Sequence, residues 1–285
     1  MARSRIELAT MNHHYMFYDL EDFFATAQKL GYPCVELWTS PQHFFMDYRQ
    51  NDPIDRVTRL IDEYGVRVHG VCPEQCNPKP HNMAAKDAGI QERTLAYFSR
   101  AVDVAKSIGA RQVLVTSGWA YYNEPVEVAR ERSAAMLKQV ARYAGEQGID
   151  LAIEALRAPE SRIANTVADL DLLLSMVDEP ALKVCLDIGA MVSAGNTIQE
   201  YFDAFGPKMI HAHYVDTGER SLHLALGDGE RDIAADILTF GQNDYQGVLS
   251  VECTDSATLT DPMAADARSM ATYLSAYEKI EAARA

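Results

Sequence analysis

The stretch GIDLAIE, residues 148–154, joins a helix stop, a short strand and a carboxylate within seven residues. Gly148 follows a long helical pattern, and glycine suits the left-handed conformation that ends many helices. Side chains alternate between the two faces of a strand, so we expect Leu151 and Ile153 on one face and Glu154 on the other. The face that carries the bulky Leu151 and Ile153 side chains is expected to pack against helices. Glu154 is expected at the carboxyl end of the strand, facing the space that the strands enclose.

The same unit, a helical pattern followed by a strand-like run, recurs along the whole chain. It predicts eight strands, at 6–10, 34–38, 66–72, 112–116, 150–154, 181–187, 209–213 and 248–252. Strands that alternate with helices pair in parallel. Eight such units in 285 residues predict an α/β fold, a single-domain (β/α)8 TIM barrel over residues 1–285, which typically needs about 250 residues. An open doubly wound sheet is the alternative, but no Gly-x-Gly-x-x-Gly follows the first strand.

Composition narrows the classes of function. The chain is 48% hydrophobic and 24% charged, as expected of a globular domain. No apolar run reaches the roughly 18 residues of a membrane span, and the start has no signal-peptide core, so we expect a cytoplasmic protein without a membrane partner. Five scattered cysteines suit a reducing compartment. The net charge of −15, without a basic cluster, argues against nucleic acid and is compatible with a neutral sugar or a cationic ligand.

Long loops follow several of the predicted strands, whereas the loops that lead into strands are short. The long ones lie at 39–45, 73–83, 117–122 and 214–230. Loops tolerate insertions, so length alone need not mean function. Four long loops at one rim nevertheless favour a site there, because active sites of this fold lie at the carboxyl ends of the strands.

The last four predicted strands end in residues that could bind a metal ion. These are Glu154, Asp187, His213 and Glu252. A lone carboxylate at a strand end is more often a hydrogen-bonding partner of a loop, but four ends in succession favour a common site. Three carboxylates at one barrel mouth raise one another's pKa unless a cation compensates them. Oxygen-rich ligation with one imidazole suits one divalent ion; we favour Mn²⁺, with Mg²⁺, Co²⁺, Ni²⁺ or Zn²⁺ as alternatives.

A second histidine, His211, shares the inward face of its strand with His213. We assign it to the barrel core, or to a place behind the ligands where it could hold His213 in one tautomer.

These residues resemble the metal site of the sugar isomerase and epimerase barrels, the xylose-isomerase-like superfamily, and within it the fructoselysine and ketose 3-epimerases. The resemblance covers nearly the whole chain. The segments that carry it, besides the strand ends, are 35–38, 43, 73–74, 82–83, 160, 187–188, 211–216, 223 and 227–229.

The resemblance implies a role for each of the four strand-end residues Glu154, Asp187, His213 and Glu252, which we call the ring. In ketose 3-epimerases the metal bridges the C2 carbonyl and C3 hydroxyl oxygens of the sugar, and two glutamates carry a proton off C3 and back. Carried over, Glu154 and Glu252 are the acid and base pair, and Asp187 and His213 are ligands only. The chemistry is coherent, because a Lewis acid stabilises an enediolate and inversion at C3 needs a proton acceptor and a donor on opposite faces.

The resemblance also implies substrate contacts by Glu160, His223, His43 and Trp38. Two positions depart from the free-ketose epimerases: Ala190 stands where they have a histidine, and His223 where they have an arginine. Fructoselysine epimerases resemble this chain in both changes, and the loss of the long histidine at position 190 would open the room that a bulky amine on C1 needs. The expected activity is therefore that of a metal-dependent 3-epimerase, an isomerase, acting on a ketose or a fructoselysine-like ketosamine.

Other functions remain open at this point. The same ring could serve a metal-dependent lyase that deglycosylates oxidised C-glycosides, which requires a small second subunit, or another sugar isomerase of this barrel family. A nuclease of the endonuclease IV type would need further ligands for three zinc ions and basic loops, which the sequence lacks. A non-catalytic binding barrel would give the four strand-end residues no function. We expect a small-molecule sugar as the partner, and homo-oligomers are common among such barrels.

Overall fold

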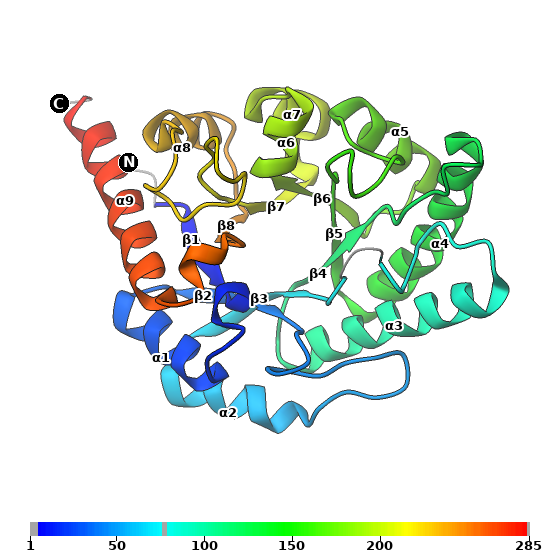
Figure 1. Ribbon diagram of the computed structural model, residues 1–285, viewed down its shortest axis with the longest axis horizontal. Helices are drawn as coiled ribbons and strands as arrows, with labels where there is room; N and C mark the ends of the chain where they lie inside the picture. Colours follow the sequence, from blue (N-terminus) through cyan, green and yellow to red (C-terminus); the bar gives the residue numbers. More distant parts are fainter. Residues whose placement is uncertain (1–4, 76–78, 284–285) are drawn as a thin grey trace. The chain divides into compact units, whose positions relative to one another are not determined.

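The strands confirm the predicted fold class. In the computed structural model, which describes residues 5–75 and 79–283, the strands are hydrogen-bonded in sequence order and close into a barrel of eight. Helices alternate with the strands along the chain (Figure 1). The strands are β1 (Glu7–Met11), β2 (Cys34–Trp38), β3 (Arg67–Cys72), β4 (Gln112–Thr116), β5 (Asp150–Glu154), β6 (Leu182–Asp187), β7 (Met209–His213) and β8 (Val248–Val251).

The helices follow the strands in the expected alternation. They are α1 (Leu20–Leu30), α2 (Ile54–Tyr64), α3 (Ala88–Ser107), α4 (Val126–Gln147), α5 (Val167–Val177), α6 (Ile188–Ala194), α7 (Ile198–Phe205), α8 (Ile233–Gln242) and α9 (Pro262–Ala282), with short 3-10 turns η1 (Asn12–Tyr15), η2 (Gly206–Lys208) and η3 (Ser256–Thr258). Among the described residues, no helix has both the length and the apolar character needed to cross a membrane.

The predicted boundaries hold to within a few residues. Gly148 ends α4 with φ of 74°, in the left-handed conformation expected of it. At the other end of α4, Pro125 is extended, with ψ of 134°, and directly precedes the helix. The helix α3 is capped by Asp87, which accepts a hydrogen bond from the Ile90 amide at 2.9 Å. At β8, Glu252 is the first residue beyond the strand.

The chain divides into two compact units. One comprises the described residues of 1–36, 59–67 and 186–285; the other comprises those of 37–58 and 68–185. Within the first, β1 pairs in parallel with β2 and β8, and β7 pairs with β8. Within the second, β3 pairs with β4, β4 with β5 and β5 with β6. A single domain over residues 1–285 stays a prediction.

Burial explains the sequence of the strands in the second unit. Every residue of β4 is buried, and Leu151 and Ile153 of β5 have no exposed surface. Strands of parallel sheets are covered on both faces, so they carry nearly continuous apolar runs. The exceptions in β5 are its first and last residues, Asp150 and Glu154, which are half-buried.

The first unit is fastened by a buried carboxylate on α9. Asp266 accepts hydrogen bonds from Thr10 at 2.7 Å and Tyr15 at 2.9 Å, and His14 Nε2 lies 3.1 Å from it. A buried charge is tolerated only when such donors satisfy it. This network joins α9 to β1 and η1.

The loop between β7 and α8 is held by a second carboxylate. Asp216 is 1% exposed, and its oxygens accept hydrogen bonds from the backbone amides of Thr217, Gly227 and Arg231. The loop that carries His223 is thereby fixed. Of the other long loops, the one at 73–83 includes residues 76–78, which lie outside the described residues.

Candidate metal centre

Asp187 is the last residue of β6 and also the N-cap residue of α6. Its Oδ1 atom accepts a hydrogen bond from the Ala190 amide, and its Oδ2 atom lies 3.0 Å from Nε2 of His223. The side chain is only 5% exposed. Burial alone would raise the pKa of this carboxyl, but the neighbouring His223 and His213 outweigh burial and hold the pKa well below its usual range. Asp187 is therefore a fixed, ionised carboxylate.

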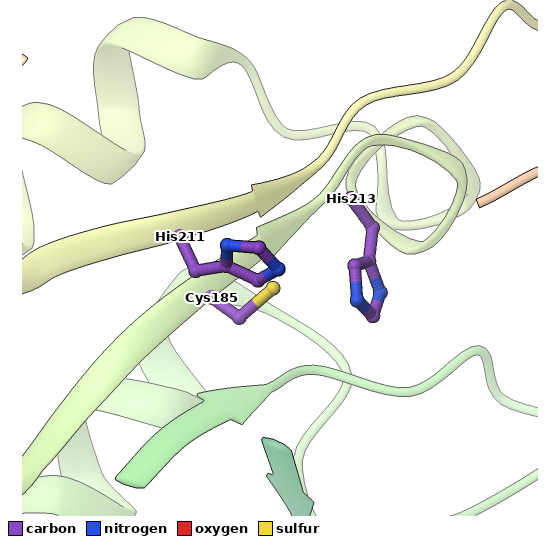
Figure 2. Close-up of side chains that lie close together, drawn as sticks. All are labelled: Cys185, His211 and His213. Carbon is purple, nitrogen blue, oxygen red and sulfur yellow. The ribbon is translucent and has the colours of Figure 1, made fainter. Parts of the chain in front are cut away.

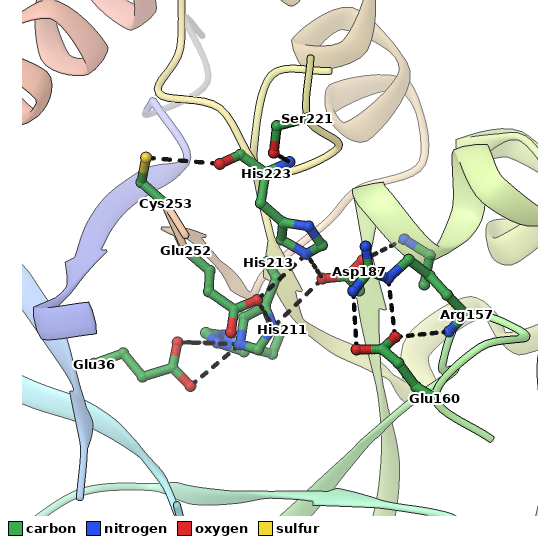
Figure 3. Close-up of polar contacts among 11 residues, drawn as sticks. Glu36, Arg157, Glu160, Asp187, His211, His213, Ser221, His223, Glu252 and Cys253 are labelled. Carbon is green, nitrogen blue, oxygen red and sulfur yellow. Dashed lines mark hydrogen bonds and ion pairs between the residues drawn. The ribbon is translucent and has the colours of Figure 1, made fainter. Parts of the chain in front are cut away.

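His213 and Glu252 face Asp187 from the next two strands. The Nδ1 atom of His213 lies 3.0 Å from Oε2 of Glu252 and 3.7 Å from Oδ2 of Asp187. His213 is fully buried, whereas the Glu252 side chain is 19% exposed. The ligand atoms of these three residues lie within 4.8 Å of one another. Figure 3 shows them converging from separate strand ends.

The opposite edge of the His213 ring faces a carboxylate that sequence reasoning did not assign to the site. Glu36, in β2, has an oxygen 2.8 Å from Nε2 of His211 and 3.4 Å from Nε2 of His213. Figure 2 shows His211 and His213 extending from β7, and their ring centroids are 5.4 Å apart. Burial opposes ionisation of Glu36, yet the two imidazoles lower its pKa well below the usual range.

The donors fit a divalent ion. A neutral His213 that donates its Nε2 proton to Glu36 keeps a lone pair on Nδ1, where it meets the lone pairs of Glu252 at 3.0 Å. A cation or a proton between these atoms removes the conflict. Two carboxylates and one imidazole are the ligands that Mn²⁺, Mg²⁺, Co²⁺, Ni²⁺ and Zn²⁺ accept.

His223 reaches this cluster from the β7–α8 loop. Its Nε2 atom lies 3.0 Å from Asp187 and 3.7 Å from Glu252. The approach depends on Gly189, because a Cβ atom there would lie 2.5 Å from the His223 ring and 2.7 Å from the Leu222 carbonyl oxygen. The backbone oxygen of His223 also accepts a hydrogen bond from the Thr254 amide, just beyond Glu252.

Glu154 stands where the sequence predicted it, at the carboxyl end of β5. In the parallel register it pairs with Cys185 of β6 and with Thr116 of β4. Cys185 lies two residues before Asp187 in the same strand, so the two share a face.

Glu160, a predicted substrate contact, is bound by a neighbour in its own loop. Both of its carboxylate oxygens accept hydrogen bonds from the Arg157 guanidinium, at 2.9 and 3.0 Å, and one also accepts from the Arg157 amide. Burial would raise the pKa of Glu160, but these bonds lower it. Any contact of Glu160 with a substrate would therefore be made by a carboxylate already paired with Arg157.

Trp38 and His43 occupy the end of β2 and the loop after it. Trp38 is half-buried and is the last residue of the strand. His43 is 1% exposed, and its backbone oxygen accepts a hydrogen bond from Arg56 at 3.1 Å.

The sequence assigned no role to three residues that lie beside the centre: Glu36, Gly189 and His13. His13 follows β1 in η1, where burial lowers its pKa and the charge of Glu252 opposes that change. The sequence did offer one signal, since Glu36 is a lone carboxylate within the apolar run of β2. A buried carboxylate in such a strand requires hydrogen-bond donors.

Comparison with known proteins identifies the family. The family model described as "Xylose isomerase-like TIM barrel" matches residues 24–275. Fructoselysine 3-epimerase of Shigella flexneri is 31% identical over 237 residues, which cover 82% of this chain and 84% of that protein. L-ribulose-5-phosphate 3-epimerase of Escherichia coli is 24% identical over 242 residues, covering 84% of this chain and 83% of that protein.

Solved structures agree on the fold. L-ribulose 3-epimerase superposes with a TM-score of 0.80 at 19% identity, covering 98% of each chain. D-allulose 3-epimerase from a Methylomonas species, in complex with D-allulose, superposes with a TM-score of 0.74 at 21% identity, covering 98% of this chain and 97% of that one.

The relatives bear the names of epimerases, which are isomerases, and they support a sugar 3-epimerase activity. The chain is an enzyme of the isomerase class and belongs to the xylose isomerase-like TIM barrel family.

Proposed function

We propose that this enzyme is a metal-dependent 3-epimerase of a ketose or a ketosamine, with a fructoselysine-like sugar as the favoured substrate. The observation that carries the proposal is the cluster of Asp187, His213 and Glu252 at successive strand ends, whose ligand atoms lie within 4.8 Å of one another. The 31% identity to fructoselysine 3-epimerase supports the favoured substrate.

The proposed ion is held by Glu154 together with Asp187, His213 and Glu252. Support for Glu154 comes from the strand register, because its partner Cys185 lies two residues before Asp187 on the same face of β6. We favour Mn²⁺, because its preference for oxygen and imidazole ligands suits three carboxylates and one histidine.

The ion, when bound, supplies a Lewis acid that polarises the substrate carbonyl and stabilises the charge of an enediolate. The chain itself moves the proton. One of Glu154 and Glu252 removes the hydrogen from C3, and the other returns a proton to the opposite face, which inverts that carbon. For this transfer, the carboxylate of each glutamate must lie within hydrogen-bonding distance of C3.

Asp187 is suited to a different task from the glutamates. Both of its oxygens already face donors, the Ala190 amide and His223, so it is held in place and serves as a ligand. Glu252 has a longer side chain and is 19% exposed, which leaves it access to a substrate. His223, whose side chain is 12% exposed, is proposed to bind the sugar near C1 and C2.

The remaining substrate contacts stay proposals. Trp38 and His43 would line the β2 end of the site, and Glu160 would act as the Arg157-bound carboxylate described above. We also propose a cytoplasmic location and a homo-oligomer, as expected from the sequence.

Hydrogen exchange at C3 tests the proposal. The metal-loaded enzyme is incubated in heavy water with fructoselysine and with a panel of free ketoses, and the recovered sugars are examined by NMR. We expect deuterium at C3 and formation of the C3 epimer. Glu252→Gln and Glu154→Gln should abolish both, and Glu146→Gln, on the exposed surface of α4, should leave both unchanged. Unlabelled sugars across the panel would refute the proposal, and a cleaved product would favour a lyase.

A further inference from the structure

Glu36 is a buried carboxylate that contacts a histidine of the candidate metal centre. Its side chain is 1% exposed, and the two histidines that it contacts are 0% exposed. Its Oε2 atom lies 2.8 Å from Nε2 of His211 and 3.4 Å from Nε2 of His213, and its Oε1 atom lies 3.5 Å from the same His213 atom. Figure 3 shows the contacts that run from the Glu36 carboxylate to the two histidines.

A carboxylate buried this deeply is costly unless N–H groups point at it. The two imidazoles both turn their Nε2 atoms toward Glu36, so each can donate a proton to it. A neutral imidazole that donates from Nε2 has its lone pair on Nδ1. The position of Glu36 thus decides which nitrogen of His213 is left to bind an ion.

The nitrogen left over is the one that faces the carboxylates. Nδ1 of His213 lies 3.0 Å from Glu252 and 3.7 Å from Asp187, across the ring from Glu36. A single imidazole therefore lies between a buried carboxylate and the proposed ligands. In metal sites a carboxylate in this relation to a histidine ligand fixes the tautomer and the ring orientation and makes the ligand more basic.

We propose that Glu36 is the positioning residue of the metal centre: it keeps the proton of His213 on Nε2, directs Nδ1 at the ion, and holds His211 out of the coordination sphere. The inference rests on the proposed function, in that it presupposes an ion at Asp187, His213 and Glu252. It adds a residue that touches neither the ion nor the substrate and that no strand-end pattern reveals.

Two other roles for Glu36 make different predictions. If Glu36 only satisfies buried histidines, its loss would lower stability and leave ion binding alone. If His211 is itself a ligand, substitution of His211 would weaken ion binding as strongly as substitution of His213.

The experiment measures Mn²⁺ affinity by titration calorimetry on the folded chain and two variants. Glu36→Gln keeps the shape but offers one acceptor oxygen to two N–H groups, so we expect Mn²⁺ to bind about 10- to 100-fold more weakly. The matched control is Asp266→Asn, which alters another buried carboxylate that contacts a histidine, His14, in the same unit. Both variants should lose stability, and only Glu36→Gln should lose Mn²⁺ affinity by this factor.

A second readout follows the tautomer directly. In the metal-free chain, ¹⁵N NMR should show the proton of the neutral His213 ring on Nε2, and Glu36→Gln should move part of it to Nδ1. Should Glu36→Gln fail to fold, Glu36→Asp keeps the charge at a shorter reach and should lose less Mn²⁺ affinity than Glu36→Ala. His211→Gln should bind Mn²⁺ within about threefold of the unaltered chain.

The outcomes separate this inference from the proposed function. An unaltered chain that binds no Mn²⁺ would refute the proposed function itself. A chain that binds Mn²⁺ and keeps its affinity within about twofold in Glu36→Gln, with His213 still protonated at Nε2, would overturn only the role of Glu36. A loss in His211→Gln equal to that in His213→Gln would make His211 a ligand and overturn it as well.

Discussion

The Nε2 atom of His223 lies 3.0 Å from the Oδ2 atom of Asp187, so a loop histidine touches a carboxylate at the end of β6. The loop can come this close only because residue 189, at the start of α6, has no side chain. The contact links a proposed metal ligand to a histidine that we propose binds the substrate.

Gly189→Ala tests this close approach. Its Cβ atom would lie 2.5 Å from the His223 ring, so the loop must shift, and we expect kcat/KM to fall at least about tenfold at a stability cost of about 1–3 kcal/mol. Kinetics and thermal unfolding measure both effects. Gly241→Ala in α8 is the control, because a Cβ there meets nothing within 4 Å; it should keep activity and gain roughly 0.5–1 kcal/mol. Unchanged kinetics in Gly189→Ala would mean that the loop adjusts freely.

Asp187→Asn separates metal binding from folding. Asparagine also caps helices well, so the bond to the Ala190 amide survives and the metal-free chain should unfold within about 1 kcal/mol of the original. The charge is lost, and Mn²⁺ affinity should fall at least about tenfold. Calorimetry and denaturant unfolding provide the two numbers. An unaltered affinity would remove Asp187 from the ligand set.

His223→Ala should impair substrate use while leaving the ion in place. His223 faces Asp187 and Glu252 but is assigned to the sugar, so we expect kcat/KM to fall about 10- to 100-fold and Mn²⁺ affinity to stay within threefold. Titration with Mn²⁺ alone and kinetics with saturating Mn²⁺ make the distinction. A large loss of Mn²⁺ affinity would instead make His223 a ligand.

The Arg157–Glu160 pair predicts the direction in which the stability of the fold changes with pH. The pKa of Glu160 is lowered in the folded chain by its bonds to Arg157, which outweigh burial. The pair therefore stabilises the fold above the ordinary glutamate pKa of about 4.3 and loses this effect as the pH falls through the lower folded value. In Arg157→Met, ¹³C NMR should show the Glu160 pKa rising above that of the unaltered chain, because burial is then unopposed. A pKa that did not move would show that the pair is not formed in solution.

Features that depend on local backbone geometry could be predicted from the sequence. Leu151, Ile153 and Glu154 follow the two-residue period of a strand, and Gly148 marks the helix end before it, because both depend on local backbone geometry. The same period placed Asp187 and His213 at strand ends.

The rest depends on contacts between distant parts of the chain. Glu36 meets His211 across 175 residues of sequence, and His223 meets Asp187 across 36. Alternation gives the face of a strand but not the partner opposite it, and loop length does not give the loop's path. The pairing of Glu160 with Arg157 is local, yet it is a choice among polar partners that spacing alone does not make.

Anomalous diffraction from a crystal grown with Mn²⁺ shows whether the four strand-end residues bind one ion. We expect one strong peak per chain, bonded to oxygens of Glu154, Asp187 and Glu252 and to Nδ1 of His213, with Nε2 of His213 still turned to Glu36. A map with no peak among these residues, and with their side chains pointing apart under abundant Mn²⁺, would refute the proposed metal centre.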